Sequence, residues 1–186
     1  GCGAILLMPT KNAKPGSIYA NVLGASVMSD GKSASITAPN GSAQQKLVKR
    51  ALDASYIKPN DVDYIEAHGT GTALGDPIEI EALAEVFAKS RSDSSPLMVG
   101  SVKSNIGHLE SAAGIAGLIK AVLVLAHEYV PPNIGLKTMN PLIDETIKTH
   151  NFHIKFPTES EPIVKEEDDR LLTAGVSSFG YSGTIA

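Results

Sequence analysis

Three properties of the sequence predict a layered α/β domain. Short β-rich runs alternate along the chain with longer helical segments, a pattern that favours this class over a sandwich or a helix bundle. The chain has 186 residues, the size of one ordinary domain or of half of a larger one. Hydrophobic residues make up 42% of the chain and charged residues 19%, proportions typical of a globular protein with a real core.

The first predicted elements precede a glycine-rich loop. Residues 18–28 form a β-rich run closed by Ser-Asp-Gly, and residues 43–54 have helical composition after a Pro-Asn-Gly turn. Residues 62–67 are expected to form a short strand. The loop at 68–72, His-Gly-Thr-Gly-Thr, follows that strand directly.

A helix is expected to begin at Asp76. Aspartate is a common N-cap, and Pro77 fits the first helical position. Glu79, three residues after the cap, can reach back to the backbone as the partner in a capping box.

The second half of the chain continues the alternation of strands and helices. Residues 97–102 are expected to form a strand, and residues 111–127 a helix that is apolar on nearly every face and therefore belongs in a core. Residues 157–170 are rich in acidic side chains and predict a surface loop between strands near 152–156 and 171–176. Small residues at the start of the helix would let a neighbouring backbone approach closely: Ala112, Ala113, Gly114, Ala116 and Gly117.

Charge, cysteine content and hydropathy exclude several function classes. The net charge of −4 offers no excess of positive charge for a phosphate backbone, so nucleic acid is not an expected partner. Cys2 is the only cysteine, which is compatible with a reducing compartment, and we expect the cytoplasm, with a plastid as the alternative. The longest apolar segment, 115–126, is interrupted by Lys120 and is shorter than the roughly 18 residues of a membrane span. We therefore predict no membrane span.

Two pairs of histidines differ in context. His150 and His153 lie three residues apart in a region expected to be a strand, with no third ligand nearby, so we expect structural roles and no metal site. His68 and His108 each follow the end of a predicted strand, the position where α/β sheets place ligands and catalytic groups. Ordinary hydrogen-bonded histidines at strand ends remain the alternative interpretation for this second pair.

Two long motifs carry a resemblance to a known family. One is Glu-Ala-His-Gly-Thr-Gly-Thr at 66–72, followed by Leu-Gly-Asp-Pro at 74–77, and the other is Gly-Ser-Val-Lys-Ser-Asn-Ile-Gly-His at 100–108. Together they resemble the C-terminal half of a β-ketoacyl synthase, in particular the ketosynthase domain of type I polyketide synthases. That family also has a Thr-Ala-Pro-Asn-Gly segment like the one at 37–41.

The resemblance implies a fold and a set of site residues. The fold would be the C-terminal half of a thiolase-like layered fold, with a mixed sheet and helices on both faces. His68 and His108 would be the catalytic histidines, and Lys103 the lysine of the family's motif. Thr70 and Thr72 match the threonines that hold the pantetheine arm of the carrier-bound substrate.

The C-terminal segment 177–184 is similar to the glycine-rich loop that gates the family's active site, so Phe179, Gly180 and Tyr181 are expected to bind substrate. The match is incomplete. The family usually has Phe at position 181, Gly at 182 and Asn at 185, where this chain has Tyr181, Ser182 and Ile185. These departures place gating and chain-length tolerance in question.

The family's nucleophile is a cysteine in the N-terminal half, and Cys2 does not match it. We therefore expect residues 1–186 to be a fragment truncated at both ends, inactive in condensation alone. The complete enzyme would be an acyltransferase that catalyses decarboxylative Claisen condensation. The implied partners are an acyl carrier protein, the N-terminal half of the ketosynthase, other synthase domains and a second copy in a homodimer. No bound cofactor is implied beyond the carrier's phosphopantetheine arm.

Three other interpretations stay open. A synthase of fatty acids or polyunsaturated fatty acids has the same histidine and lysine motifs. A condensation-incompetent domain that binds carrier protein or only decarboxylates malonyl groups would have another residue in place of the upstream cysteine. A free-standing small protein conflicts with the family's need for both halves of the fold.

Overall fold

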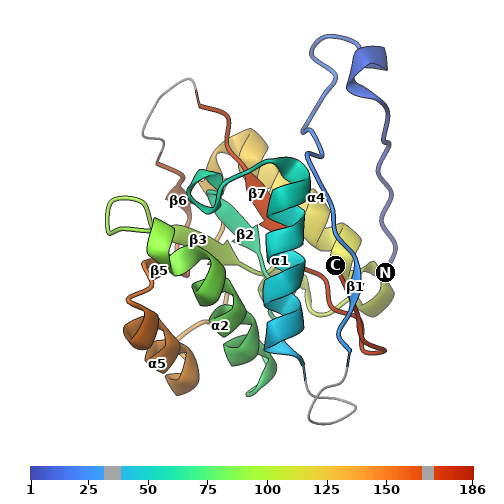
Figure 1. Ribbon diagram of the computed structural model, residues 1–186. Coiled ribbons are helices and arrows are strands. Elements are labelled where there is room, and N and C mark those ends of the chain that lie inside the picture. Colours follow the sequence, from blue (N-terminus) through green and yellow to red (C-terminus); the bar gives the residue numbers. More distant parts are fainter. Residues whose placement is uncertain (32–38, 165–169) are drawn as a thin grey trace.

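The centre of the computed structural model, which describes residues 1–31, 39–164 and 170–186, is a four-stranded parallel sheet (Figure 1). Its strands run in the order β5-β3-β2-β7, so each parallel pair is joined through helical or loop crossovers. The strands are β2 Tyr64–Glu66, β3 Leu97–Gly100, β5 Ile154–Lys155 and β7 Ala174–Val176. With helices on both faces of this sheet, the predicted α/β class is confirmed.

Antiparallel pairing in the described residues consists of two small ladders and two isolated bridges, Ser92 with Ser95 and Phe179 with Ile185. β1 Met28–Ser29 pairs with β8 Thr184–Ile185, and β4 Tyr129–Val130 pairs with β6 Glu161–Pro162. The predicted strand at 18–28 is therefore wrong over most of its length. Since β8 offers only two residues to pair with, residues 19–27 lie along the surface without ladder bonds in the described structure.

One face of the sheet is covered by α1 Gly41–Ser55, α2 Gly75–Phe87 and α5 Pro141–His150. Helix α2 lies between the other two, and its Leu83 and Phe87 bury their side chains in the cluster that contains Ile65 and Val99 of the sheet. The predicted helix at 43–54 and strands at 62–67 and 97–102 are confirmed, each with slightly different bounds. Short 3₁₀ turns lie at Thr10–Asn12, Pro59–Asp61, Ala88–Ser90 and Glu110–Ala112.

Helix α5 was not expected from the sequence. The Asn140 side chain accepts a hydrogen bond from the Leu142 N–H, and Pro141 occupies the first helical turn. Asparagine followed by proline is a helix-start signal that could have revealed it. Because α5 ends at His150, the strand expected around that histidine is wrong, and β5 begins only at Ile154.

The opposite face is covered by α4 Ala113–His127, which follows the short helix α3 Lys103–Ile106. Ala121 and Val124 pack with Tyr64 of β2, while the outward side chains of Ile119 and Leu123 are exposed. The predicted helix at 111–127 is confirmed, but only one of its faces is covered by the described chain. The small residues of its first turns admit side chains: a Cβ on Gly117 would lie 3.1 Å from Glu66 Cγ.

The helical stretch Glu110–His127 is also long and apolar enough to cross a membrane by length and composition, with a mean hydropathy of 1.4. Core helices meet the same criterion, and here Lys120 is buried against Glu66 of the sheet. The absence of a span stays a prediction.

Two sequence predictions fall partly outside the described residues. The family-like segment at 37–41 includes residues 37 and 38, and the acidic loop at 157–170 includes residues 165–169. Within the described part of that loop, Glu161 and Pro162 form β6.

Candidate active site

Three loops meet at one edge of the parallel sheet. Glu66 at the end of β2 is in register with Gly100 of β3 and with Val176 of β7. Because these strands are parallel, the segments that follow them emerge at the same edge. The loops that begin at residues 67, 101 and 177 are therefore neighbours, although they are far apart in the sequence.

The two histidines of the motifs lie side by side at this edge. The ring centroids of His68 and His108 are 5.6 Å apart, and the rings meet edge to face. Phe179, from the third loop, places its ring centroid 5.2 Å from that of His68. The structure thus brings together three of the residues that the family resemblance singled out.

Backbone donors determine which ring nitrogens carry the protons. The Phe179 N–H donates to His68 Nδ1 at 3.3 Å, and the Glu110 N–H donates to His108 Nδ1 at 3.0 Å. A nitrogen that accepts a hydrogen bond holds no proton, so each neutral ring carries its proton on Nε2. Each imidazole can therefore donate one N–H to a ligand.

The environment of His68 keeps its ring neutral. Burial lowers the pKa of His68 from 6.5 to about 4, and electrostatic repulsion from Lys103 and then from the neighbouring His108 adds to this effect. At neutral pH the imidazole is therefore an uncharged N–H donor and a poor source of protons.

Lys103 is the first residue of α3 and is half-buried. Burial lowers its pKa, while the carboxylates of Glu66, Glu79 and Asp76 favour its charged form. His108 follows α3 across Gly107, whose φ of +78° lies in the region that favours glycine. The short helix and this glycine turn place the lysine and the second histidine on the same side of the sheet edge.

The predicted capping box at α2 does not form. Helix α2 begins at Gly75 without a side-chain cap, and the Asp76 carboxylate accepts the Gly71 N–H at 3.1 Å. Glu79 accepts the N–H groups of His68 at 2.8 Å and Gly69 at 2.9 Å. The glycine-rich loop folds back over the start of α2. Its N–H groups donate to the carboxylates of Asp76 and Glu79, which the capping-box rule would pair with the backbone of the helix itself.

Glu79 is a site residue whose role sequence reasoning missed. Its side chain is buried, and burial raises its pKa to about 7 although two backbone N–H groups oppose the shift. The signal that could have found it is its position 11 residues after His68. The loop after β2 leads into the first turn of α2, and that turn brings Glu79 back to the end of β2.

The other expected substrate-binding residues occupy different surroundings. The hydroxyls of Thr70 and Thr72 lie 3.4 Å apart in the loop after His68. Gly180 donates its N–H to the Thr184 carbonyl at 2.7 Å in a tight hairpin. Tyr181, at the tip of that hairpin, is 84% exposed, and no described contact brings it to the imidazoles.

The second pair of histidines does not form a shared site. His150 Nε2 lies 2.8 Å from Glu81 Oε1, and His153 Nδ1 lies 2.8 Å from Asp93 Oδ1. Glu81, Glu85 and His150 come within 4.8 Å of one another. Thr146 donates to the other oxygen of Glu81, so that carboxylate is already satisfied by protein groups.

Comparison with known proteins identifies the family. Residues 19–137 match the family described as "Beta-ketoacyl synthase, C-terminal domain". The chain is 42% identical, over 191 aligned positions and its whole length, to a phenolphthiocerol/phthiocerol polyketide synthase of Mycobacterium bovis. It is 44% identical, over 91% of its length, to highly reducing polyketide synthase 40 of Fusarium mangiferae. These alignments cover 10% and 6% of the two relatives.

A solved structure supports the same assignment. The ketosynthase from module 6 of the bacillaene synthase of Bacillus subtilis 168 superposes with a TM-score of 0.80 and 39% sequence identity. The match covers 90% of this chain and 29% of that one. The thiolase-like fold expected from the motifs is confirmed, and the chain belongs to the β-ketoacyl synthase family, of which it forms the C-terminal domain.

Proposed function

We propose that this chain supplies the histidine half of a ketosynthase active site in a type I polyketide synthase. The reaction is the decarboxylative Claisen condensation of a malonyl-type unit, held on an acyl carrier protein, with an acyl group held on an enzyme cysteine. The observation that carries the proposal is the pair of adjacent imidazoles, each with Nδ1 occupied by a backbone N–H and Nε2 free to donate.

The chemistry needs donors for an enolate oxygen. When the malonyl thioester loses carbon dioxide, the bond between the carboxyl carbon and Cα breaks and its electrons form an enolate. The enolate carbon attacks the acyl thioester, a carbon–carbon bond forms, and the cysteine leaves as a thiolate that later takes a proton from water. Two N–H donors directed at the enolate oxygen stabilise the charge, and each such donor is worth roughly 3 to 4 kcal/mol.

Neutral donors suit this step better than charged ones. An imidazolium would donate its proton to the carbanion and end the reaction without a new carbon–carbon bond. Burial lowers the pKa of His68 to about 4, so its ring stays neutral under ordinary conditions. Lys103 contributes positive charge close to this ring without displacing it from its hydrogen bond to Phe179.

The proposed partners complete the site. The nucleophilic cysteine belongs to the N-terminal half of the ketosynthase, and Cys2 is not that residue. Support for a covering partner comes from α4, where Ile119 and Leu123 line an apolar groove of about 520 Å³ next to Val102 and Ile106. We assign the N-terminal half to this groove. Thr70 and Thr72 would hold the phosphopantetheine arm of the carrier.

Some features of the whole protein belong to the same proposal. The complete enzyme is an acyltransferase that works as a homodimer in the cytoplasm, with further synthase domains and without nucleic acid or a membrane span. The names of the relatives favour a polyketide over a fatty acid as product.

The test uses the complete protein with His68→Ala, His108→Ala and both changes together. Each single change should lower chain extension by at least about 100-fold, because each removes one enolate donor. Acylation of the upstream cysteine, followed by mass spectrometry, should persist in part. His153→Ala, which alters a surface pair with Asp93, is the matched control and should extend chains at the parental rate.

Two outcomes would overturn the proposal. A double variant that extends chains like the parent would show that the imidazoles are not the enolate donors. A parental protein that releases carbon dioxide from malonyl carrier without extending the chain would favour the decarboxylating alternative.

A further inference from the structure

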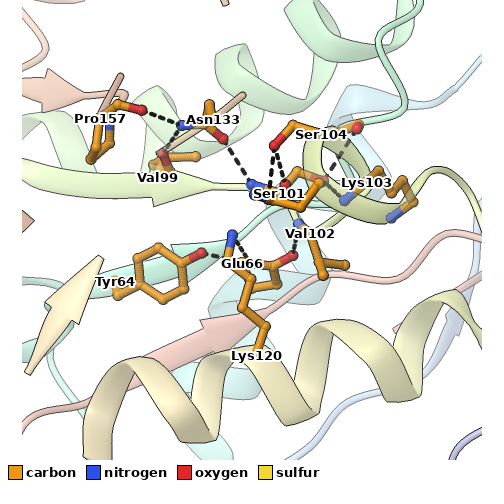
Figure 2. Close-up of polar contacts among 12 residues, drawn as sticks. Tyr64, Glu66, Val99, Ser101, Val102, Lys103, Ser104, Lys120, Asn133 and Pro157 are labelled. Atoms are coloured by element: carbon orange, nitrogen blue, oxygen red, sulfur yellow. Dashed lines mark hydrogen bonds and ion pairs between the residues drawn. The ribbon is translucent and has the colours of Figure 1, made fainter. Parts of the chain in front are cut away.

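One buried carboxylate lies next to the two loops that carry the proposed catalytic residues. These catalytic loops are the one after β2, with His68, and the one after β3, with Lys103 and His108. Glu66, at the end of β2, is 1% exposed, and Figure 2 shows its side chain between Tyr64, Lys120 and Val102. The Tyr64 hydroxyl donates to Oε2 at 2.5 Å, and Lys120 Nζ lies 3.1 Å from the same oxygen. The Val102 N–H donates to Oε1 at 2.5 Å. Both oxygens are therefore engaged, one by the sheet and α4 and the other by the loop that carries Lys103.

The hydrogen bond from Val102 to Glu66 holds the start of the turn formed by Val102 and Lys103. Val102 immediately precedes Lys103, the first residue of α3. Asn133 Oδ1 holds the preceding residue by accepting the Ser101 N–H at 3.0 Å (Figure 2). Two adjacent backbone amides are thus fixed by side chains, so the direction in which the chain leaves β3 depends on Glu66 and Asn133.

Ser101 connects this turn to the loop of the first histidine. Its hydroxyl donates to the Gly69 carbonyl at 3.3 Å and accepts the Lys103 N–H at 3.4 Å. Gly69 directly follows His68 and lies so close that a Cβ there would be 2.8 Å from Ser101 Cβ. A shift of the turn at Val102 would therefore reach both catalytic loops.

Glu66 also acts on the charge of Lys103. Burial lowers the pKa of Lys103, and among the opposing carboxylates Glu66 has the largest effect, ahead of Glu79 and Asp76. The charge of Lys103 in turn helps to lower the pKa of His68. The carboxylate thus has both a geometric and an electrostatic route to the imidazole.

We propose that Glu66, which contacts no substrate, is a positioning residue for the condensation proposed above: it holds the Val102–Lys103 turn in place and puts a negative charge near Lys103, beside the two histidines. The proposal rests on the proposed function only through the condensation readout. Its second readout, the protonation of Lys103, does not require condensation.

The principal variant is Glu66→Gln combined with Lys120→Met in the complete protein. Glutamine keeps the size of the side chain and removes its charge, and methionine removes the ammonium that would otherwise be buried without a counter-ion. The matched control is Asp63→Asn with Arg170→Met, which neutralises a pair of a buried aspartate and a partly buried arginine next to the opposite end of β2. Lys120→Met alone removes the ion pair between Lys120 and Glu66 but keeps Glu66, so it distinguishes the effect of losing the ion pair from the effect of losing the carboxylate.

Two measurements are made on each protein. The first is the condensation rate as a function of pH, and the second is the pH midpoint for reductive methylation of Lys103, read by peptide mass spectrometry. For the principal variant we expect condensation to fall by about tenfold or more, since displacement of a catalytic group by 1 Å can cost on the order of 100-fold. The alkaline limb of the rate profile and the Lys103 midpoint should both move to lower pH, whereas neither control should lower that midpoint.

Each other outcome overturns the inference. Parental condensation with an unchanged Lys103 midpoint would show that Glu66 has no such role. Lost condensation with an unchanged midpoint would indicate a merely structural carboxylate, and so would an equal shift in the Asp63 control. Should the principal variant unfold, the test uses Glu66→Asp, which keeps the negative charge but is too short to reach the Val102 N–H in the same way. Parental condensation in Glu66→Asp would refute the positioning role. A parent that never condenses refutes the proposed function, while the Lys103 midpoint still tests Glu66.

Discussion

The titration of His68 offers the most direct check on the electrostatics of the site. Its pKa is lowered from 6.5 to about 4, first by burial and then by Lys103 and His108. At about 1.4 kcal/mol per pKa unit this corresponds to roughly 3 kcal/mol in favour of the neutral ring. Because solvent reaches part of the side chain, the contribution to folding is smaller, about 1 to 2 kcal/mol.

The sign of the pH dependence follows from proton binding. Between pH 6.5 and about 4 the unfolded chain binds a proton at His68 and the folded chain does not. The contribution of this residue to stability is therefore fully present above pH 6.5 and decreases as the pH falls towards 4. The neutral donor itself persists through this window for as long as the fold does.

Diethyl pyrocarbonate reports the neutral form, because the neutral imidazole ring attacks it and the imidazolium does not. In the complete protein, the rate of modification at His68, read by peptide mass spectrometry, should change little from pH 8 to about 5 and fall by half near pH 4. N-acetylhistidine, with a midpoint near 6.5, is the reference, and circular dichroism checks the fold at each pH. Lys103→Met should raise the midpoint, which stays below 6.5 because burial is the larger cause.

Two results would refute this reasoning. A parental midpoint at or above 6.5 would mean that the ring is not desolvated in the complete protein. A midpoint that Lys103→Met lowers or leaves unchanged would mean that the lysine charge does not act on His68. Lys137→Met, at an exposed position, should leave the midpoint where it is in the parent.

Three further changes test packing around the site. Leu83→Ala, at a side chain that is 1% exposed, should cost about 2 to 5 kcal/mol and lower the thermal midpoint; a change within error would contradict the core assignment. Gly69→Ala should reduce condensation strongly, since its φ is +43° and its Cβ would meet Ser101, and a parental rate would contradict the close approach of the two loops. Leu123→Asp should destabilise the complete protein if the outer face of α4 is covered, whereas Leu171→Asp, at an 83% exposed position, should not; equal midpoints would leave α4 uncovered.

The elements that sequence reasoning predicted correctly are those with local signals. The helix at 43–54 follows a Pro-Asn-Gly turn, and in the structure the Asn40 side chain accepts the Ala43 N–H at its N-terminus. The strands at 62–67 and 97–102 are short, and their paired residues are buried on both faces, as in central parallel strands, although the first includes the acidic residues Asp63 and Glu66. The adjacency of His68 and His108 follows from the same logic, since both come after parallel strands.

The features that were missed depend on partners far along the chain. The strand at 18–28 has the right composition, but a strand needs a neighbour, and β8 offers only two residues. Asp76 and Glu79 satisfy the local rule for a capping box, yet they bind the loop N–H groups five or more residues away. The tautomer of His68 depends on the Phe179 N–H, 111 residues away, which no local pattern contains.

The glycines of α4 connect the motif residues to the architecture beneath them. By composition the small residues allow a close neighbour, and the structure identifies two of these neighbours as side chains: a Cβ at Gly114 would lie 2.9 Å from Ser178 Oγ, and one at Gly117 would lie 3.1 Å from Glu66 Cγ. A side chain at position 117 of α4 would force Glu66 to shift by a few tenths of an ångström. The cost of about 1 kcal/mol for glycine inside a helix is thus linked to a buried carboxylate that accepts the Val102 N–H at the start of the Val102–Lys103 turn. Helix α4, strand β2 and the turn at Val102 and Lys103 therefore depend on one another. A substitution that shifts any of them should also change the positions of His68 and His108.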